Sequence, residues 1–503
     1  GRSEQRAPMS TPNDPKPLSL TEAMVPVASL IVLVALSYFL FGDGGAAGPN
    51  QVALTIATMI AVFIGWRRGH TLESLREAAV HSVGSGIGAM FILLAVGSLI
   101  GTWAMSGTLV AMVYYGLQIL SPNYFYVTAA ATCAVVAASI GSSWTVVGTI
   151  GIGLMGIAVN MDLSPAITAA AIISGAYFGD TTSPLSDSSN LAAATGGVDL
   201  YRHVRETLLT SSLALVLALA VFWMLGRPGD FDAGAKIGAI RSAFDITPVL
   251  FAPLVLVVAL AVFKVPPFTA IFLGAVAGGV LAAFVAPDRI VAFATRGDGD
   301  LPRWLAVVKG VWLALASGYT GSTGVSMIDQ LVSRGGMASM LNTIWLIITA
   351  LAFGGVVEKA GVLDRLITPV IESAKSAGRL VAYLVGSVIG TNIVTADQYI
   401  AIVLPGRMFK GAFEKRGFAP VVLTRSVGAS ATPTSALVPW NSCGAYMAAT
   451  LGVATFSYLP YAVFNVASPL LAIAVAYLGI RMPRTGPEAA PEVATRKTGA
   501  GEG

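Results

Sequence analysis

Two carboxylates and six hydroxyls lie in one polar stretch, GAYFGDTTSPLSDSSNLAAA, which runs from Gly175 to Ala194 between long apolar segments. The carboxylates are Asp180 and Asp187, and Asn190 adds an amide shortly afterwards. The hydroxyls belong to Thr181, Thr182, Ser183, Ser186, Ser188 and Ser189. Oxygens of these kinds are the ligands that hard cations prefer. Pro184 interrupts any helix that would carry them, because proline lacks the backbone donor.

The rest of the chain has the composition of a membrane protein. Of its 503 residues, 55% are hydrophobic and 11% are charged, whereas a soluble domain carries about 25% charged residues. A carboxylate at the bilayer centre costs about 2.5–3.5 kcal/mol. A broken helix is tolerated at that depth only where protein buries it or where it lines a wet cavity. We therefore predict a broken helix whose oxygens converge on a cation or a small polar substrate.

Few features of the sequence point to an enzyme or to a cofactor. It has no HExxH, CxxC, P-loop or GxSxG pattern, and its two cysteines lie in separate apolar stretches. The net charge of +4 is small and indicates no nucleic-acid partner. We expect a protein that is not an enzyme and that binds no cofactor. We treat His70, His81 and His203 as surface residues, the last within a polar loop predicted over 201–206.

About 20 apolar residues cross a bilayer, and segments of this kind recur between residues 20 and 480. We predict an all-α polytopic membrane protein with about 11–14 membrane segments and surrounding membrane lipids. The positive-inside rule places the N-terminus in the cytoplasm, because arginines follow the second predicted span. The predicted parts are a polar tail (1–19), a first transmembrane repeat (20–226), a linker (227–245), a second repeat (246–480) and a disordered tail (481–503).

A second set of polar residues interrupts apolar runs in the other half of the chain. The stretches are TNIVTADQY and SVGASATPTSALVPWNSCGAY. Their candidate ligands are Asn392, Asp397, Thr434, Ser435 and Asn441. Asp397 can bind a cation, or it can form a structural ion pair with a base such as Arg407. In the first half, Asp180 or Asp187 can instead cap the half-helix that follows the proline.

The two halves of the chain resemble each other. Three pairs of positions match in the same order and at nearly equal separations in the sequence. The pairs are Gly107 with Gly361, Ile140 with Ile389, and Thr182 with Thr434. Internal repeats are typical of secondary transporters, whose sites lie where the repeats meet.

The polar stretches also resemble those of a known family. GDTTSPLSDSSNLA is similar to the GDxxSPLSDTTNLA signature of NhaC-type sodium/proton antiporters, and TADQYIAIVLPGRMF and TSALVPWNSCGAYMA resemble motifs of that family's second half. The segments LIGTWAMSGT and GGVVEKAGVL also fit, so the resemblance covers about residues 20–480. It implies two inverted repeats with re-entrant hairpins, a dimerising scaffold domain, and a transport domain that moves like an elevator. It also implies the cytoplasmic membrane of a prokaryote.

Two positions depart from the pattern of that family. Thr181 and Thr182 stand where the family usually has Lys-Met, and Gly428 and Ala429 stand where it usually has Glu-Asp. One positive and two negative charges are therefore absent, and fewer carboxylates remain to exchange protons with sodium.

The leading functional prediction is a sodium/proton antiporter in which one aspartate holds either a cation or a proton. The groups assigned to the cation and the proton are Asp180, Asp187, Asn190 and Asp397, and the first three are the predicted sodium ligands. The groups assigned to the substrate are Ser186, Ser188, Ser189, Asn392, Thr434, Ser435 and Asn441.

Three other functions are compatible with the sequence. The second prediction is a sodium- or proton-coupled exchanger of a small organic acid, such as malate or lactate, or of an amino acid. An intramembrane enzyme would need a base or an aspartate pair at catalytic distance, and no known protease motif is present. A passive channel is less consistent with repeated broken stretches than alternating access is.

Overall fold

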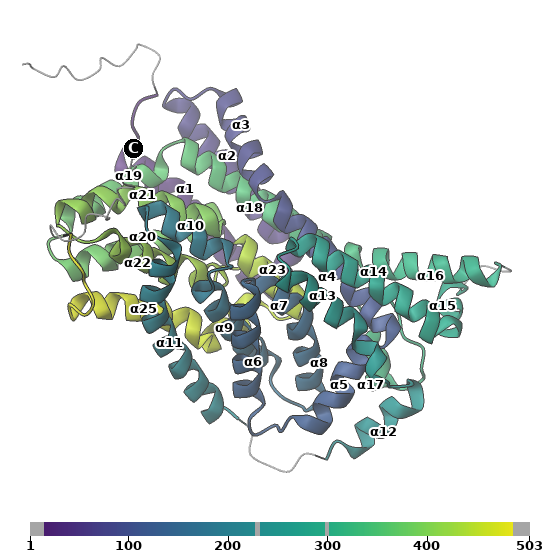
Figure 1. The fold of residues 1–503 in the computed structure, drawn as a ribbon. Coiled ribbons are helices and arrows are strands. Elements are labelled where there is room, and N and C mark those ends of the chain that lie inside the picture. Colours follow the sequence, from purple (N-terminus) through teal and green to yellow (C-terminus); the bar gives the residue numbers. More distant parts are fainter. Residues whose placement is uncertain (1–14, 227–231, 297–300, 486–503) are drawn as a thin grey trace, which may run out of the picture.

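The computed structural model describes residues 15–226, 232–296 and 301–485 (Figure 1). These residues form helices and connecting loops, with two isolated antiparallel bridges as the only strand-like pairing among them. The outer parts of the two predicted tails, 1–14 and 486–503, lie outside the described residues.

Eight of the described helical segments are long and apolar enough to cross a membrane, and two bent pairs raise the number to ten. The eight are α1 (Leu20–Phe41), α2 (Pro49–Arg67), α4 (Ile87–Ser106), α7 to α8 (Ser143–Asn160), α11 (Leu200–Met224), α14 (Pro267–Val285), η4 to α18 (Met337–Lys359) and α20 (Ala377–Thr395). The bent pairs are α12 (Gly234–Ala243) with Pro248–Val262, and Thr455–Tyr461 with α25 (Val463–Tyr477). The all-α polytopic prediction is therefore confirmed.

Helix ends recur at matching places in the two halves of the chain, which confirms the internal repeat. A left-handed glycine separates α4 from the next helix, and another separates α18 from the next: Gly107 (φ 90°) is the C-cap of α4, and Gly361 (φ 78°) follows Ala360, the C-cap of α18. Each is followed by a helix of 12 residues, α5 (Thr108–Ile119) or α19 (Val362–Ser373). A Cβ atom disfavours this conformation, so glycine is the residue that ends both helices at little cost.

The same correspondence continues through the polar stretches. Helix α6 (Phe125–Ile140) ends at the left-handed Gly141, and α20 ends at the left-handed Ala396. Ile140 therefore corresponds to Thr395, and the sequence pairing of Ile140 with Ile389 was out of register.

Broken helices complete each half. Helix α9 (Pro165–Thr182) is followed after a break by α10 (Asp187–Gly196), and α22 (Pro420–Ser435) by α23 (Ser442–Leu451). The short helices α10 and α23 have ten residues each and both end at a left-handed glycine.

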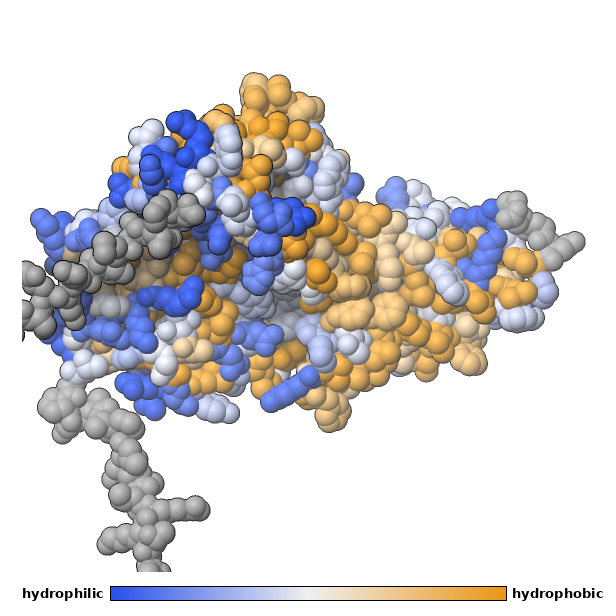
Figure 2. Space-filling model, turned by 90° about the horizontal axis from the view of Figure 1, so that it is seen from above, coloured by the Kyte–Doolittle hydropathy of each residue, from blue (hydrophilic) through white to orange (hydrophobic). Residues whose placement is uncertain are grey.

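The helices form two groups in Figure 1. Helix α18 packs on α2 and α3 (Leu72–Ser85), while α4 packs on α14 and α16 (Arg303–Ser317). In the other group, α9 packs on α6 and α11, and α22 packs on α20, α25 and α21 (Gln398–Lys415). Figure 2 shows an apolar surface over the arm that contains α14 and α16, where Phe284, Trp304 and Trp312 are exposed. Such a surface suits contact with lipid tails.

Helices α6 and α9 approach each other at two glycines of the Asp180 stretch, Gly175 and Gly179. A Cβ atom built at Gly175 would lie 2.1 Å from the carbonyl oxygen of Ala130, and one built at Gly179 would lie 2.3 Å from the backbone nitrogen of Ala138. Small residues at this spacing let two membrane helices pack backbone to backbone. The contact fixes the end of α9, and therefore the residue that follows Gly179.

We predict that Gly179→Ala destabilises the protein by about 1–3 kcal/mol, because the added methyl group meets backbone atoms that cannot move alone. Thermal unfolding of the purified protein in detergent measures this loss. Gly390→Ala on α20 is the matched control, since a Cβ atom there meets no atom within 4 Å. An equal loss in the two variants would contradict the close approach of α6 and α9.

Candidate functional site

Asp180 lies in the last turn of α9, and its side chain is buried with 8% of the residue exposed. Three serine hydroxyls donate hydrogen bonds to its carboxylate. Ser143, in the first turn of α7 (Ser143–Val146), donates to Oδ2 at 2.5 Å. Ser188 donates to Oδ1 at 3.1 Å, and Ser186 donates to the same oxygen. The carboxylate therefore sits where α7, α9 and α10 meet.

Side chains of α10 also satisfy the backbone of the broken helix. The Ser189 hydroxyl donates to the carbonyl oxygens of Asp180 and Thr181, at 3.1 Å each. The Asn190 amide donates to two carbonyl oxygens between α9 and α10, at 2.8 and 3.3 Å. The carbonyls of Asp180, Thr181 and Pro184 have no helical donor because the helix ends there, so the side chains replace the missing bonds. The Ser186 carbonyl also accepts from the backbone N–H of Asn190.

Asp187 and Asn190 lie outside the buried part of this site. Asp187 is exposed in the first turn of α10, and among the described residues no hydrogen bond or ion pair joins it to Asp180. The N-cap of α10 is Ser186, whose hydroxyl accepts from the backbone N–H of Ser189 at 3.4 Å. Neither aspartate is therefore the cap. The structure brings Asp180 together with the predicted serines Ser186, Ser188 and Ser189. It leaves the side chains of Asp187 and Asn190 exposed.

In the second half, Asn392, Thr434 and Asn441 form one buried network. The Asn392 amide donates to Thr434 Oγ1 at 3.0 Å and to the carbonyl of Ala431 at 2.9 Å. Asn441 donates to Asn392 Oδ1 at 3.1 Å, and its own Oδ1 accepts from the backbone N–H of Cys443 at 3.0 Å. Asn441 therefore caps α23 and ties it to α20.

A proline weakens the end of α22, and α25 compensates for it. Pro433 has no N–H group, so the carbonyl of Ala429 lacks its usual helical donor. The Ser468 hydroxyl of α25 donates to this carbonyl at 2.7 Å. The Asn465 amide of the same helix donates to the carbonyl of Pro433 at 2.8 Å.

Asp397 caps α21 and is 5% exposed. Its Oδ1 accepts from the backbone N–H groups of Tyr399 at 2.6 Å and Ile400 at 3.0 Å. Within the described residues it forms no ion pair with Arg407, so the pairing weighed from the sequence is replaced by a cap. Arg407 instead lines a cavity of about 450 Å³ together with Glu358 and Asp364.

The sequence did not single out Gln398, which connects the two broken stretches of the second half. Its Oε1 accepts from the Ser435 hydroxyl at 3.0 Å and from the Cys443 thiol at 3.2 Å. Gln398 follows the left-handed Ala396 by two positions, as Ser143 follows the left-handed Gly141. That shared position, once the repeat is in register, is the signal that could have identified both residues.

The two halves meet at the ends of their short helices. The rings of Trp144 on α7 and Tyr446 on α23 stack with centroids 4.0 Å apart and an interplanar angle of 11°. The Tyr446 hydroxyl donates to the carbonyl of Trp144 at 2.7 Å. The site is therefore built between the repeats.

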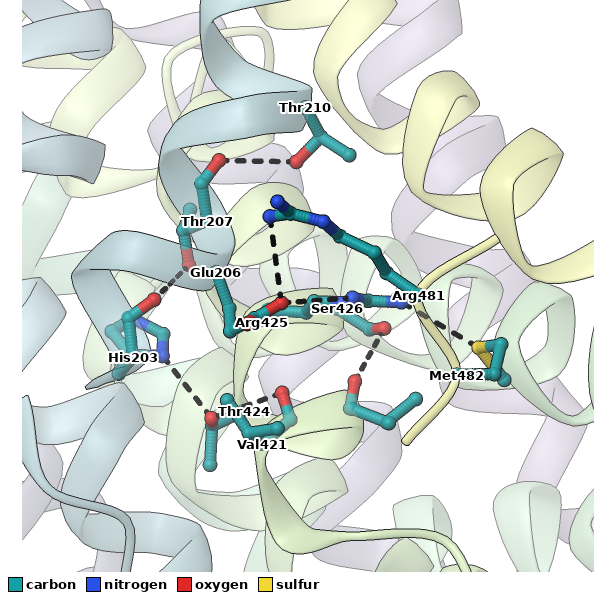
Figure 3. A network of polar contacts seen from close by, with 11 residues as sticks. His203, Glu206, Thr207, Thr210, Val421, Thr424, Arg425, Ser426, Arg481 and Met482 are labelled. Carbon is teal, nitrogen blue, oxygen red and sulfur yellow. Dashed lines mark hydrogen bonds and ion pairs between the residues drawn. The ribbon is translucent and has the colours of Figure 1, made fainter. Parts of the chain in front are cut away.

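One residue predicted at the surface is buried. His203 is 0% exposed and lies on α11, because Asp199 caps that helix ahead of the predicted 201–206 loop. Its imidazole contacts Thr424 of α22 (Figure 3). The surface prediction for His203 was wrong, since a polar loop pattern and the first turns of a capped helix have similar compositions.

The donor set around Asp180 is suited to a hard cation or a proton. Each serine hydroxyl can donate to the carboxylate, or rotate and offer a lone pair to a cation. Among the described residues, no three His, Cys, Asp or Glu side chains gather as a transition-metal site. A buried carboxylate beside broken helices, between two repeats, is the arrangement of a secondary transporter.

Comparison with known proteins identifies the family. A family model described as "Na+/H+ antiporter family" matches residues 175–480. The chain is 37% identical to the Na(+)/H(+) antiporter NhaC of Alkalihalophilus pseudofirmus, over 86% of this chain and 90% of that protein. The chain therefore belongs to the Na+/H+ antiporter family, and its relatives include NhaC-type proteins.

Relatives with other names are nearly as similar. A malate-2H(+)/Na(+)-lactate antiporter of Bacillus subtilis is 33% identical over 92% of this chain and 95% of its own length. The arginine/ornithine antiporter ArcD of Halobacterium salinarum is 32% identical over 94% and 95%. Among solved structures, MtrF of Neisseria gonorrhoeae matches with a TM-score of 0.32 and 15% identity over 92% of this chain and 99% of MtrF, a likeness too low to support an argument.

We predict that Asn441→Ala lowers the unfolding free energy by about 1–3 kcal/mol, because it removes the cap of α23 and the tie to Asn392. Thermal unfolding in detergent measures the change. Asn190→Ala is the matched control, because this amide also bonds backbone carbonyls but is exposed. If Asn190→Ala lowers the unfolding free energy as much as Asn441→Ala does, the buried network around Asn441 does not stabilise the fold as predicted.

Proposed function

We propose that this protein exchanges sodium ions for protons across the cytoplasmic membrane of a prokaryote, and that Asp180 holds the two ions alternately. The observation that carries the proposal is the buried Asp180 carboxylate, which accepts hydrogen bonds from three serines at the break between α9 and α10. Membership of the Na+/H+ antiporter family supports it.

The exchange follows from competition at one carboxylate. A sodium ion bound to Asp180 uses the lone pairs of the carboxylate and of Ser143, Ser186 and Ser188 after their hydroxyls rotate away. A proton bound to Asp180 removes the negative charge that attracts the cation. Because the two ions exclude each other at the same group, each crossing with one ion requires a return with the other. We assign sodium to Asp180 and the serines, since the side chains of Asp187 and Asn190 are exposed.

In this proposal, the polar side chains of the second half stabilise the structure around the site. The Asn392, Thr434 and Asn441 side chains bond to one another or to the backbone, and Ser435 bonds to Gln398. Asp397 adds a second buried carboxylate, from the other half of the chain. Its charge raises the affinity of the region for cations without direct contact.

We extend the proposal to the movement of the protein. The repeats over 20–226 and 246–480 are inverted in the membrane, and each contributes broken helices to a transport domain that moves like an elevator. The scaffold contains α4, α14 and α16 and forms a homodimer. The apolar surface at Phe284, Trp304 and Trp312 supports a membrane or dimer contact for this arm (Figure 2).

A second candidate function is coupled exchange of a small organic acid or an amino acid. The relatives named for malate, lactate, arginine and ornithine favour it, because their identities with this chain are close to those of the sodium/proton antiporters. Against it, the buried amides of the second half are already bonded within the protein, which leaves few free donors for a carboxylate substrate.

We predict that Asp180→Asn abolishes sodium-driven proton movement, because an amide at this position neither loses a proton nor carries the charge that binds sodium. Purified protein in liposomes with a pH-sensitive dye and a preset proton gradient measures this movement after pulses of sodium, lithium or potassium. Asp187→Asn is the control and keeps at least about half of the activity, because Asp187 is an exposed surface carboxylate.

The same assay separates the two candidate functions. If no cation moves protons through the wild-type protein while malate, lactate or an amino acid does, the sodium/proton proposal is wrong and the second candidate holds. If Asp180→Asn exchanges sodium for protons like the wild type, Asp180 is not the shared binding group.

We predict that Asp397→Asn leaves thermal stability nearly unchanged but weakens sodium affinity about threefold or more. Asparagine caps helices about as well as aspartate does, so only the negative charge is lost. The apparent sodium affinity in the liposome assay and the unfolding temperature are measured on the same preparation. A large loss of stability with unchanged affinity would show that Asp397 has only the capping role.

A further inference from the structure

We propose that His203 is a second proton-binding group of this transporter, and that its protonation is linked to the Asp180 site through the packing of α10 and α11 against α22. The proposal goes beyond sodium/proton exchange at Asp180, since it concerns a different residue on a different helix. The sodium arm of the second experiment and the exchange assay of the third experiment rest on that proposed function.

The imidazole is buried with one nitrogen bonded and the other free. His203 Nδ1 lies 3.1 Å from the Thr424 hydroxyl, which itself donates to the carbonyl of Val421 at 3.3 Å. The Thr424 hydroxyl can therefore accept from an Nδ1–H group while it donates to Val421, and this tautomer has an unprotonated Nε2. This nitrogen is buried and has no hydrogen-bond partner among the described residues. A buried polar atom without a partner is uncommon in native structures and calls for an explanation.

The free nitrogen faces a gap in the side chains of α22. A Cβ atom built at Gly428 would lie 3.3 Å from His203 Nε2 and 3.2 Å from Cε1. The methyl group of Ala192 on α10 approaches the same position. Small residues on both neighbouring helices thus make room for the ring, and a proton added at Nε2 would point into the contact between α10 and α22.

The charged groups near the ring belong to three elements (Figure 3). Glu206 lies one turn after His203 on α11, and its carboxylate is 3.5 Å from Arg425 of α22 and 3.9 Å from Arg481 after α25. Arg425 also lies 3.5 Å from the Met482 sulfur. On α10, the residue nearest the same position of Gly428 is Ala192, which is uncharged. One carboxylate therefore already faces two guanidinium groups.

A proton on His203 would add a positive charge to the contact between α11 and α22, which also holds the Glu206–Arg425 ion pair. Both ion pairs of Glu206 are longer than hydrogen bonds, so they can rearrange without breaking a tight contact. Protonation therefore favours a state in which α11 and α22 shift relative to each other, whereas the neutral imidazole fits the arrangement described here.

The helices that hold His203 also hold the Asp180 site. Helix α10 begins with Ser186 and Ser188, which bond Asp180, and ends just before α11. Helix α22 runs from the Thr424 contact to Ser435, which bonds Gln398. A shift at one end of these helices moves the residues at the other end. Such coupling is reciprocal, so the state of the Asp180 site also changes the proton affinity of His203.

The first experiment observes the proton directly. The chain has three histidines, so the variant His70→Gln/His81→Gln leaves His203 as its only imidazole. Isotope-labelled histidine in this variant, held in lipid nanodiscs, is followed by NMR while the pH is changed. We expect the His203 resonance to shift as the pH is lowered from about 8 to about 4. A resonance that does not change over this range overturns the proposal of proton binding.

The second experiment tests the linkage. The titration is repeated with Asp180→Asn added, and also with sodium chloride in place of the same concentration of N-methylglucamine chloride. We expect each change to move the titration midpoint. If neither moves it, the linkage is overturned. If Asp180→Asn moves it but sodium does not, the linkage stands and the proposed sodium exchange fails.

The third experiment measures the pH profile of exchange in liposomes for His203→Gln and for the control His81→Gln, which replaces an exposed histidine. We expect His203→Gln to reduce the change of rate between about pH 4 and pH 8 at least threefold, and His81→Gln to leave it unchanged. If the His203→Gln profile equals that of the wild type, the role of His203 in exchange is overturned while exchange at Asp180 stands. If His203→Gln does not fold, the NMR experiments decide, since they keep His203.

Discussion

The structure depends on one constraint, which is that backbone groups freed by a broken helix must find partners at membrane depth. Pro433 leaves the carbonyl of Ala429 without its helical donor, and the Ser468 hydroxyl replaces it. In the first half, Ser189 donates to two carbonyls at the end of α9. An unsatisfied group in this environment costs several kcal/mol. Many polar side chains near the broken stretches therefore form hydrogen bonds with backbone groups.

The same constraint explains why the candidate site is so compact. Most polar side chains near the breaks are used by the backbone or by one another, as Asn392 and Asn441 show. The Asp180 carboxylate differs, because hydroxyls that can rotate surround it and its charge changes with a proton. A small ion can enter such a group with little rearrangement, whereas a larger organic solute would have to displace bonds that support the fold.

The proposed role of His203 would extend the site beyond the groups that contact the transported ion. The residue lies on α11 and contacts Thr424 of α22, while Asp180 bonds Ser186 at the start of α10. A transporter needs its binding groups to respond to the arrangement of the whole domain, and a buried titratable side chain between moving helices provides one physical means.

The sequence by itself determined the all-α membrane fold, the two repeats and the Asp180 stretch. Apolar length, helix breakers and a local group of oxygens are properties of neighbouring residues, so they can be read without a structure. Only the tertiary structure decided which polar residues are buried together. It placed Asp187 at the surface and brought Ser143 to Asp180, Gln398 to Ser435 and His203 to Thr424. These contacts join helices that are distant in the sequence, and packing between helices, rather than local spacing, sets them.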